Sequence, residues 1–116
     1  MVARYSPCIM QAVILAAGEG KRMQPLTFER PKPLIEVAGK PILEHVMDAL
    51  PPEVDEIILV IGYKGEMIRE RYGDAYKGIP LRYVHQWMAA GTAHALSIAR
   101  PFLNGRFLFM YADDIH

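Results

Sequence analysis

The sequence of 116 residues contains one cysteine, no net charge and no long apolar run. The single thiol, Cys8, excludes an internal disulfide framework and disfavours a cysteine-based zinc site. Because 13 basic side chains balance 13 acidic ones, the overall charge provides no attraction to nucleic acid or to an anionic membrane, and any anion site must be local. The longest apolar runs, such as 57–61 and 107–111, are far too short to span a bilayer.

The first ten residues also lack the apolar stretch of a secretory signal, so we expect a cytoplasmic protein. With 52% hydrophobic and 22% charged residues, the composition is that of an ordinary globular domain. The four histidines show no spacing typical of metal ligands. The basic cluster of Lys21, Arg22, Arg30 and Lys32 lacks the extended patch that nucleic-acid binding requires. We therefore expect neither a nucleic-acid partner nor a membrane partner.

Three apolar segments, at 11–17, 56–61 and 106–111, predict strands, and the alternating segment 81–85 predicts a weaker one. Helices are expected at 41–50, with Pro41 as the first helical residue, at 64–72, with Gly73 after the end, and at 92–99. The prolines between 25 and 33 predict a loop without regular structure. Strands that are apolar on both faces are typical of a parallel sheet covered by helices. The alternation of strands and helices along the chain predicts a doubly wound, mostly parallel α/β sheet with Rossmann-like topology. Ligands of such a sheet bind at the carboxyl ends of the strands.

The densest motif follows the first strand, where Gly18 and Gly20 precede Arg22 and Lys32. Glycines at such a point let backbone N–H groups approach an anion, and fixed cations beside them suit a polyphosphate. A Walker A loop is excluded because Arg22 stands where Ser or Thr is needed, and a dinucleotide fingerprint because Met23 replaces the third Gly or Ala. Taken alone, these residues also fit a tight turn followed by a solvated basic loop.

Taken whole, the segment 15–33 resembles the signature of the sugar-1-phosphate nucleotidyltransferases. That pattern, Leu-Ala-Ala-Gly-x-Gly-x-Arg-(Leu/Met)-x-Pro-Leu-Thr followed by Pro-Lys-Pro, is matched at 15–27 and 31–33, and 39–42 resembles the family's next segment. The resemblance implies catalytic roles for Arg22, beside the departing pyrophosphate, and for Lys32, near the α-phosphate. It also implies a nucleotide-binding role for four residues of this loop, Leu15, Ala17, Gly18 and Gly20.

A second matching segment begins with Gln86 and continues five residues later with Gly91 and Thr92. In similar members of the family the Gln amide and the Gly-Thr backbone hold the nucleobase. An amide donates and accepts at once, as a uracil or thymine edge requires, which favours UTP or dTTP over GTP. Taken alone, Gln86 is a surface residue at a strand end and Thr92 a helix N-cap, a role compatible with the functional one. Residues 87–90 depart from the family pattern.

The last matching segment is Tyr111-Ala112-Asp113-Asp114, at the end of the last strand. The resemblance implies that Asp113 is a ligand of Mg²⁺, the expected cofactor. A carboxylate that faces a phosphate loop suits Mg²⁺, which prefers one or two carboxylates together with phosphate oxygens and water. Taken alone, this aspartate is a turn or helix N-cap residue.

The resemblance therefore implies transfer of a nucleoside monophosphate from an NTP to a sugar 1-phosphate with release of pyrophosphate. It covers the amino-terminal, nucleotide-binding portion of the family's catalytic domain, at 10–116, and leaves 1–9 as an extension or a cloning remnant. We expect the chain to bind nucleotide but to be incomplete for catalysis. An exposed strand edge would favour self-association into a homo-oligomer.

Two alternative functions remain open from the sequence. A non-catalytic sensing or scaffold domain of nucleotidyltransferase type would often have lost Arg22, Lys32 or Asp113, and all three are present. A molybdopterin cytidylyltransferase has a similar glycine-rich loop, but the Pro-Leu-Thr and Pro-Lys-Pro segments argue against it.

Overall fold

The computed structural model describes residues 10–17, 31–62, 64–86 and 91–112, with Gly91 and Thr92 described as backbone only. Its helices and strands follow one another along the chain as β1 (Met10–Ala16), η3 (Lys32–Leu34), β2 (Glu36–Val37), β3 (Lys40–Pro41), α1 (Ile42–Asp48), β4 (Val54–Ile61), α2 (Gly65–Tyr72), β5 (Ala75–Tyr76), β6 (Ile79–His85), α3 (Gly91–Ala99), η4 (Arg100–Phe102) and β7 (Phe107–Tyr111). None of the described helices has the length and apolar character needed to cross a membrane.

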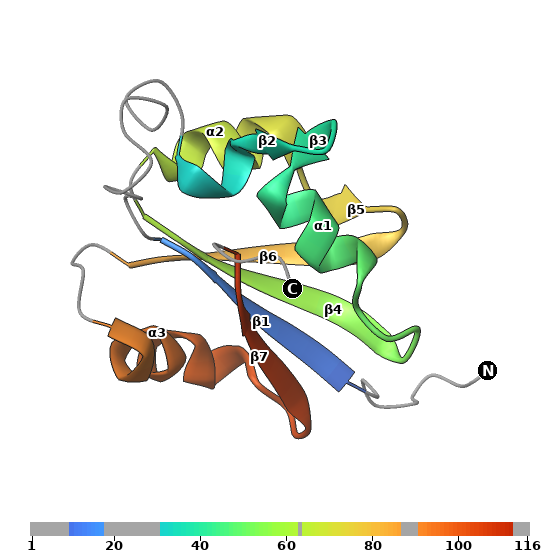
Figure 1. Cartoon of the computed structure of the whole chain (residues 1–116). Coiled ribbons are helices and arrows are strands. Elements are labelled where there is room, and N and C mark those ends of the chain that lie inside the picture. Colours follow the sequence, from blue (N-terminus) through green and yellow to red (C-terminus); the bar gives the residue numbers. More distant parts are fainter. Residues whose placement is uncertain (1–9, 18–30, 63, 87–90, 113–116) are drawn as a thin grey trace.

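A five-stranded sheet with the order β5-β6-β4-β1-β7 forms the centre of the molecule (Figure 1). β1 lies between β4 and β7 and is parallel to both, and β4 is parallel to β6. The two-residue β5 adds an antiparallel edge. In chain order the parallel strands therefore lie as third, second, first, fourth, which is the Rossmann arrangement. The predicted doubly wound, mostly parallel α/β fold is confirmed.

The helices cover the two faces of the sheet unequally: α1 and α2 lie over one face and α3 over the other (Figure 1). The chain moves outward from β1 through β4 to β6, and α3 then returns it to the opposite side of β1, where β7 pairs. The direction of winding thus reverses between β1 and β7. In sheets of this kind, ligands bind at the carboxyl ends of the strands beside such a reversal.

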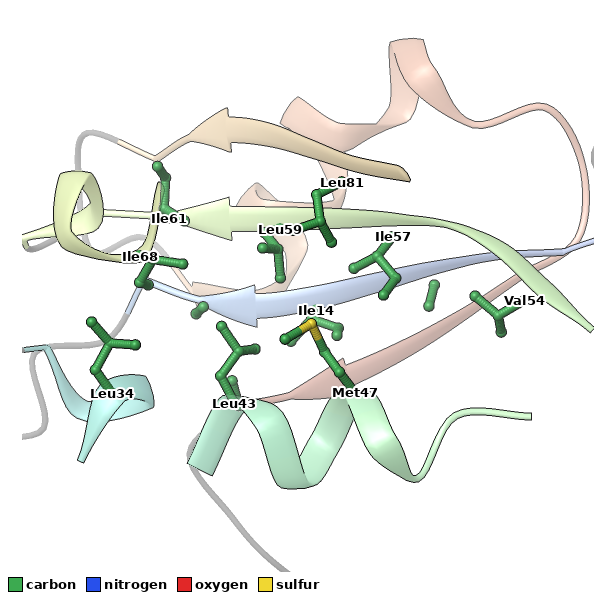
Figure 2. Close-up of a cluster of buried hydrophobic side chains, with 13 residues drawn as sticks. Ile14, Leu34, Leu43, Met47, Val54, Ile57, Leu59, Ile61, Ile68 and Leu81 are labelled. Atoms are coloured by element: carbon green, nitrogen blue, oxygen red, sulfur yellow. The ribbon is translucent and has the colours of Figure 1, made fainter. Parts of the chain in front are cut away.

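The larger core fills the space between the sheet and the α1–α2 layer. Leu43 and Met47 of α1, Ile68 of α2 and Leu34 of η3 are buried there against strand residues (Figure 2). The strand residues are mainly aliphatic: Ala12, Ile14, Ala16, Val54, Ile57, Leu59, Ile61 and Leu81. Figure 2 shows Leu34 beside Ile68 at the end of the cluster toward which β1 and β4 run. The core thus extends to the carboxyl edge of the sheet.

The second core lies under α3 and is built from smaller side chains. Ala95 and Ala99 are fully buried against Val13, Ile58 and Val60. Successive residues of β1 and β4 therefore point alternately toward α3 and toward α1, and both sets are buried. This burial on two faces explains why these strands are continuous apolar runs.

The structure differs from the prediction at the segment before α1. Pro41 belongs to β3 and has extended backbone angles (φ −57°, ψ 147°), so it precedes the helix and is not its first residue. The predicted loop contains the short helix η3, and an unpredicted hairpin of β2 and β3 follows. Its turn consists of Ala38 and Gly39, both at positive φ (53° and 89°). Gly73 follows α2 as predicted, with φ 65°.

A buried polar residue, Gln11, joins three segments at the amino-terminal edge of the sheet. Its side chain is 1% exposed. The amide nitrogen donates to Glu56 Oε1 at 2.6 Å and to the carbonyl of Phe102 at 2.8 Å, and the amide oxygen accepts from the N–H of Asn104 at 2.8 Å. The burial of this amide is therefore offset by hydrogen bonds to β4 and to the η4–β7 connection.

We expect Gln11→Met to lower the free energy of unfolding by about 2–4 kcal/mol, because a thioether of similar size leaves two backbone groups unpaired, at about 1–3 kcal/mol each. Urea denaturation of both proteins measures this difference. Asn104 contributes only its backbone N–H, so Asn104→Ala is the matched control and should shift stability by less than about 0.5 kcal/mol. Equal stability of Gln11→Met and wild type would contradict the role of this amide.

A charged cluster ties the end of α1 to the neighbouring strands. Asp48 accepts hydrogen bonds from the Tyr76 hydroxyl at 2.8 Å and from Lys77 Nζ at 3.1 Å, and it forms an ion pair with Lys40. The hydrogen bond from Lys40, with those from Tyr76 and Lys77, lowers the pKa of Asp48 to about 2. These donors offset the unfavourable position of a carboxylate at a helix C-terminus.

Because the pKa of Asp48 is lower in the folded chain, its contribution to stability is present above about pH 3.9 and is lost as the pH falls toward 2. Asp48→Asn should lower stability at pH 7 by roughly 0.5–1 kcal/mol, since solvent screens the cluster. It should also reduce the loss of stability between pH 4 and pH 2. Thermal unfolding of both proteins across this range tests the effect, and parallel curves would refute it.

Candidate functional site

Four residues that directly follow the parallel strands form the carboxyl edge of the sheet: Ala17, Gly62, Gln86 and Ala112. Two of them continue the strand pairing by one hydrogen bond. The N–H of Gln86 donates to the carbonyl of Ile61 at 2.7 Å, and the N–H of Ala112 donates to the carbonyl of Leu15 at 3.0 Å. The points at which the chain leaves β6 and β7 are therefore fixed relative to their neighbours.

Gly62 lies in close contact with the ends of β1 and β6. A Cβ at this position would lie 3.1 Å from Ala17 Cβ, from the Ala17 carbonyl oxygen and from the Gln86 carbonyl oxygen. A side chain at residue 62 would therefore crowd the two predicted nucleotide-binding residues on either side, Ala17 and Gln86. Gly62 belongs to no motif of the sequence, and its position directly after an apolar strand is the one local signal that marks it.

The connection from β4 to α2 is also tight. The N–H of Gly65 donates to the carbonyl of Gly62 at 2.8 Å, and a Cβ on Gly65 would lie 2.9 Å from Ile61 Cβ and Cδ1. Lys64 between them has a positive φ of 55°. The first turn of α2 is thus held against the last residue of β4.

Gln86 is 7% exposed, so the interpretation as a surface residue at a strand end is wrong. Its side-chain nitrogen lies 3.0 Å from Nδ1 of His94, on α3. Because an amide nitrogen only donates, this contact is a hydrogen bond when Nδ1 of the imidazole is unprotonated. α3 begins at Gly91, which places Thr92 within the first helical turn and not at the predicted N-cap. The N–H groups of a first turn have no acceptor within the helix.

Lys32 is held on a rigid support beside the core. The prolines on either side, Pro31 and Pro33, are fully buried, and Leu34 is 5% exposed. Backbone N–H groups of Leu34 and Ile35 donate to the carbonyls of Pro31 and Lys32, both at 3.0 Å. The Lys32 side chain is half-buried and has no ion-pair partner within the described part of the chain.

The two residues from the end of β1 differ in what they contribute. The Leu15 side chain packs on the core under α3, and its carbonyl oxygen is bonded to Ala112. Ala17 is half-buried and contacts Gly62. Leu15 therefore stabilises the carboxyl edge of the sheet from within the core, whereas Ala17 lies at that edge.

Four predicted site residues lie outside the described residues: Gly18, Gly20, Arg22 and Asp113. Ala112, directly before Asp113, is buried and is bonded to Leu15 at the end of β1. Within 10–17, 31–62, 64–86 and 91–112, no group of three or more His, Cys, Asp or Glu side chains could hold a metal ion. A Mg²⁺ ion bound mainly by phosphate oxygens and water needs no such group, so a site with Asp113 as its protein ligand fits the chemistry of these residues.

The family model described as "Nucleotidyl transferase" matches residues 11–116. The chain belongs to this family. The resemblance to the sugar-1-phosphate nucleotidyltransferases predicted from the sequence is thereby confirmed, and the relatives agree with it. The chain is 45% identical over 107 residues to the UTP–glucose-1-phosphate uridylyltransferase AglF of Haloferax volcanii, a match that covers 91% of this chain. It is 42% identical over 106 residues to the bifunctional protein GlmU of Methanococcus maripaludis, again over 91% of this chain.

Two solved structures share the fold. A putative glucose-1-phosphate thymidylyltransferase from Bacillus anthracis superimposes with a TM-score of 0.82 at 28% identity, over 90% of this chain. A UDP-glucose pyrophosphorylase in complex with UDP-glucose superimposes with a TM-score of 0.76 at 24% identity, also over 90% of this chain. The chain spans 44% and 46% of these structures, and 44% and 25% of the AglF and GlmU relatives.

The close packing at Gly62 predicts that Gly62→Ala lowers the free energy of unfolding by about 1–3 kcal/mol, because two of the three contacted atoms are backbone oxygens that must move. Denaturant titration measures the loss, and backbone amide shifts should change at positions 17 and 86. Gly105→Ala is the matched control, since a Cβ there would meet no atom within 4 Å. It should be neutral or slightly stabilising. A Gly62→Ala protein as stable as the control would contradict the close contact.

Proposed function

We propose that this chain is the nucleotide-binding portion of a sugar-1-phosphate nucleotidyltransferase, at residues 10–116, preceded by an extension or a cloning remnant at 1–9. The enzyme transfers a nucleoside monophosphate from an NTP to a sugar 1-phosphate and releases pyrophosphate. One observation carries the proposal: in a member of this family, Ala17, Gly62 and Gln86 are packed together at the carboxyl edge, beside the reversal of winding between β1 and β7. A ligand that binds there lies against backbone atoms of three strands.

The base is proposed to pair with the Gln86 amide and to lie near the backbone of Gly91 and Thr92. Gln86 is held at its backbone by Ile61 and at its side chain by His94, so its amide is positioned before nucleotide binds. Donor and acceptor on one amide match the edge of uracil or thymine. Two similar proteins, the UTP–glucose-1-phosphate uridylyltransferase AglF and the putative glucose-1-phosphate thymidylyltransferase, support the same pair of bases and favour UTP or dTTP.

The triphosphate is proposed to follow the loop after β1, with the backbone of Gly18 and Gly20 against its oxygens. A phosphate oxygen of the sugar 1-phosphate attacks the α-phosphorus in line, and the bond to the bridging oxygen breaks as pyrophosphate leaves. Arg22 stabilises the charge on the leaving pyrophosphate, and Lys32 stabilises charge near the α-phosphate. Such catalysis depends on positioning and charge neutralisation and needs no covalent intermediate. Rigid support of Lys32 by two buried prolines suits this role.

Asp113 is proposed to hold Mg²⁺, which when bound neutralises part of the charge on the triphosphate. Because Ala112 is bonded to Leu15, this carboxylate follows a fixed point beside β1, on the same edge as Ala17. The acid and the phosphate loop thus leave the sheet from adjacent strands.

We also propose that the enzyme is cytoplasmic and has neither a nucleic-acid partner nor a membrane partner. β7 is the edge strand of the described sheet, and Phe107 and Tyr111 on it are 40% and 45% exposed. An apolar edge of this kind supports self-association into a homo-oligomer.

Calorimetry with Mg²⁺–UTP tests the proposal directly. Wild type should bind, and Lys32→Met and Asp113→Asn should each weaken binding roughly tenfold to hundredfold, as expected for a lost contact to a charged group of about 1.5–3 kcal/mol. Arg106→Met is the charge-matched control, because Arg106 lies before β7 at the opposite edge of the sheet. Unchanged affinity in both site variants would count against the assigned roles. We expect little or no pyrophosphate release from the 116-residue chain with UTP and glucose 1-phosphate.

A further inference from the structure

We propose that His94 determines the base specificity of this site by fixing the orientation of the Gln86 amide, so that bases with a ring N3–H, uracil and thymine, are accepted and cytosine is rejected. The inference rests on the proposed function, in which Gln86 faces the base. It adds a residue of α3 that acts through Gln86. His94 is therefore a positioning residue.

The proposed hydrogen bond between the two side chains assigns a hydrogen position on each of them. Gln86 Nε2 lies 3.0 Å from His94 Nδ1, and the amide nitrogen must be the donor. His94 Nδ1 then carries a lone pair, and the imidazole proton resides on Nε2. The Gln86 nitrogen is directed toward α3, and its oxygen is directed away from His94.

The rest of Gln86 has little freedom to change this orientation. Its side chain is 7% exposed, its N–H is bonded to Ile61, and its carbonyl oxygen is in close contact with Gly62. The backbone at His94 is held as well, because the next residue, Ala95, is fully buried against the sheet, and the His94 side chain is half-buried. The fold therefore holds the backbone at both ends of the hydrogen bond.

A fixed amide distinguishes two bases that a rotating amide accepts equally. Uracil and thymine present a donor at N3 between two carbonyl acceptors, whereas cytosine presents an acceptor at N3 beside an amino donor. A glutamine can pair with either pattern by turning its terminal torsion by about 180°, a rotation that side-chain amides ordinarily allow. With its nitrogen bonded to His94, Gln86 offers oxygen and nitrogen in one order only. With the oxygen opposite N3, cytosine places two acceptors against each other, which a buried site rejects strongly.

The hydrogen bond itself is tested by NMR on the nucleotide-free chain labelled with ¹⁵N. The expected result is the Nε2–H tautomer of His94 and a Gln86 side-chain amide proton protected from exchange. In His94→Leu, that protection should disappear. A protonated Nδ1 on His94, or Gln86 resonances that do not respond to the substitution, would overturn the inference whatever nucleotide the protein binds.

The effect on specificity is tested by calorimetry with Mg²⁺–UTP and Mg²⁺–CTP on the 116-residue chain. Wild type should prefer UTP at least tenfold, and His94→Leu should lose most of this ratio. His94→Asn should retain it, because Asn Oδ1 provides an acceptor at the place of His94 Nδ1. His45→Leu is the matched control: His45 Nε2 donates to the Val37 carbonyl at 2.6 Å on the other face of the sheet.

The outcomes separate the inference from the function on which it rests. If wild type binds UTP in preference to CTP and His94→Leu preserves the ratio, the role of His94 is wrong and the proposed function stands. If wild type binds neither nucleotide, the proposed function fails and the specificity inference fails with it. Circular dichroism of each variant confirms folding, and His94→Asn provides a second comparison if His94→Leu does not fold.

Discussion

The parallel pairing of β1 with β4 and β7 is the constraint on which the whole carboxyl edge depends. Ala16 lies opposite Ile61, and Leu15 lies opposite Tyr111, so neighbouring strands end within a residue of each other. The next residues are consequently brought together, and backbone hydrogen bonds continue one step beyond the strands. Residues far apart in the sequence thus meet at one edge because they follow strands of matched register. The apolar residues buried on both faces of β1 hold this register in place.

Much of this arrangement could be predicted from the sequence, because burial on two faces leaves a recognisable apolar run. The strands at β1 and β4 and the helix ending before Gly73 follow from such local patterns. The hairpin of β2 and β3 could not be predicted, since its strands have two residues each and its turn places Ala38, a residue with a side chain, at positive φ. Short elements are decided by tertiary contacts that a local pattern does not contain.

Residues of the candidate site could be proposed from the sequence only where a motif marked them. Lys32 and Gln86 stand in segments that resemble family signatures, whereas Gly62 and His94 do not. Gly62 belongs to the candidate site because it is in close contact with Ala17 and Gln86, although these two residues lie 45 and 24 positions away in the sequence. His94 follows the matching Gly91-Thr92 segment by two positions but is not part of it, and it belongs to a helix whose composition is typical of core packing. Contacts between distant segments, not residue types, distinguish these two positions.

The thin core under α3 has a consequence for how base recognition can change. Ala95 and Ala99 are fully buried, so methyl groups set the separation between this helix and the sheet. A larger side chain at either position would lift α3, and His94 would move with it relative to Gln86 on β6. In the proposed site, substitutions in this core that never touch nucleotide would therefore change which base is bound. The proposed selectivity would then depend on the volume of buried side chains under α3 as well as on the residues that contact the base.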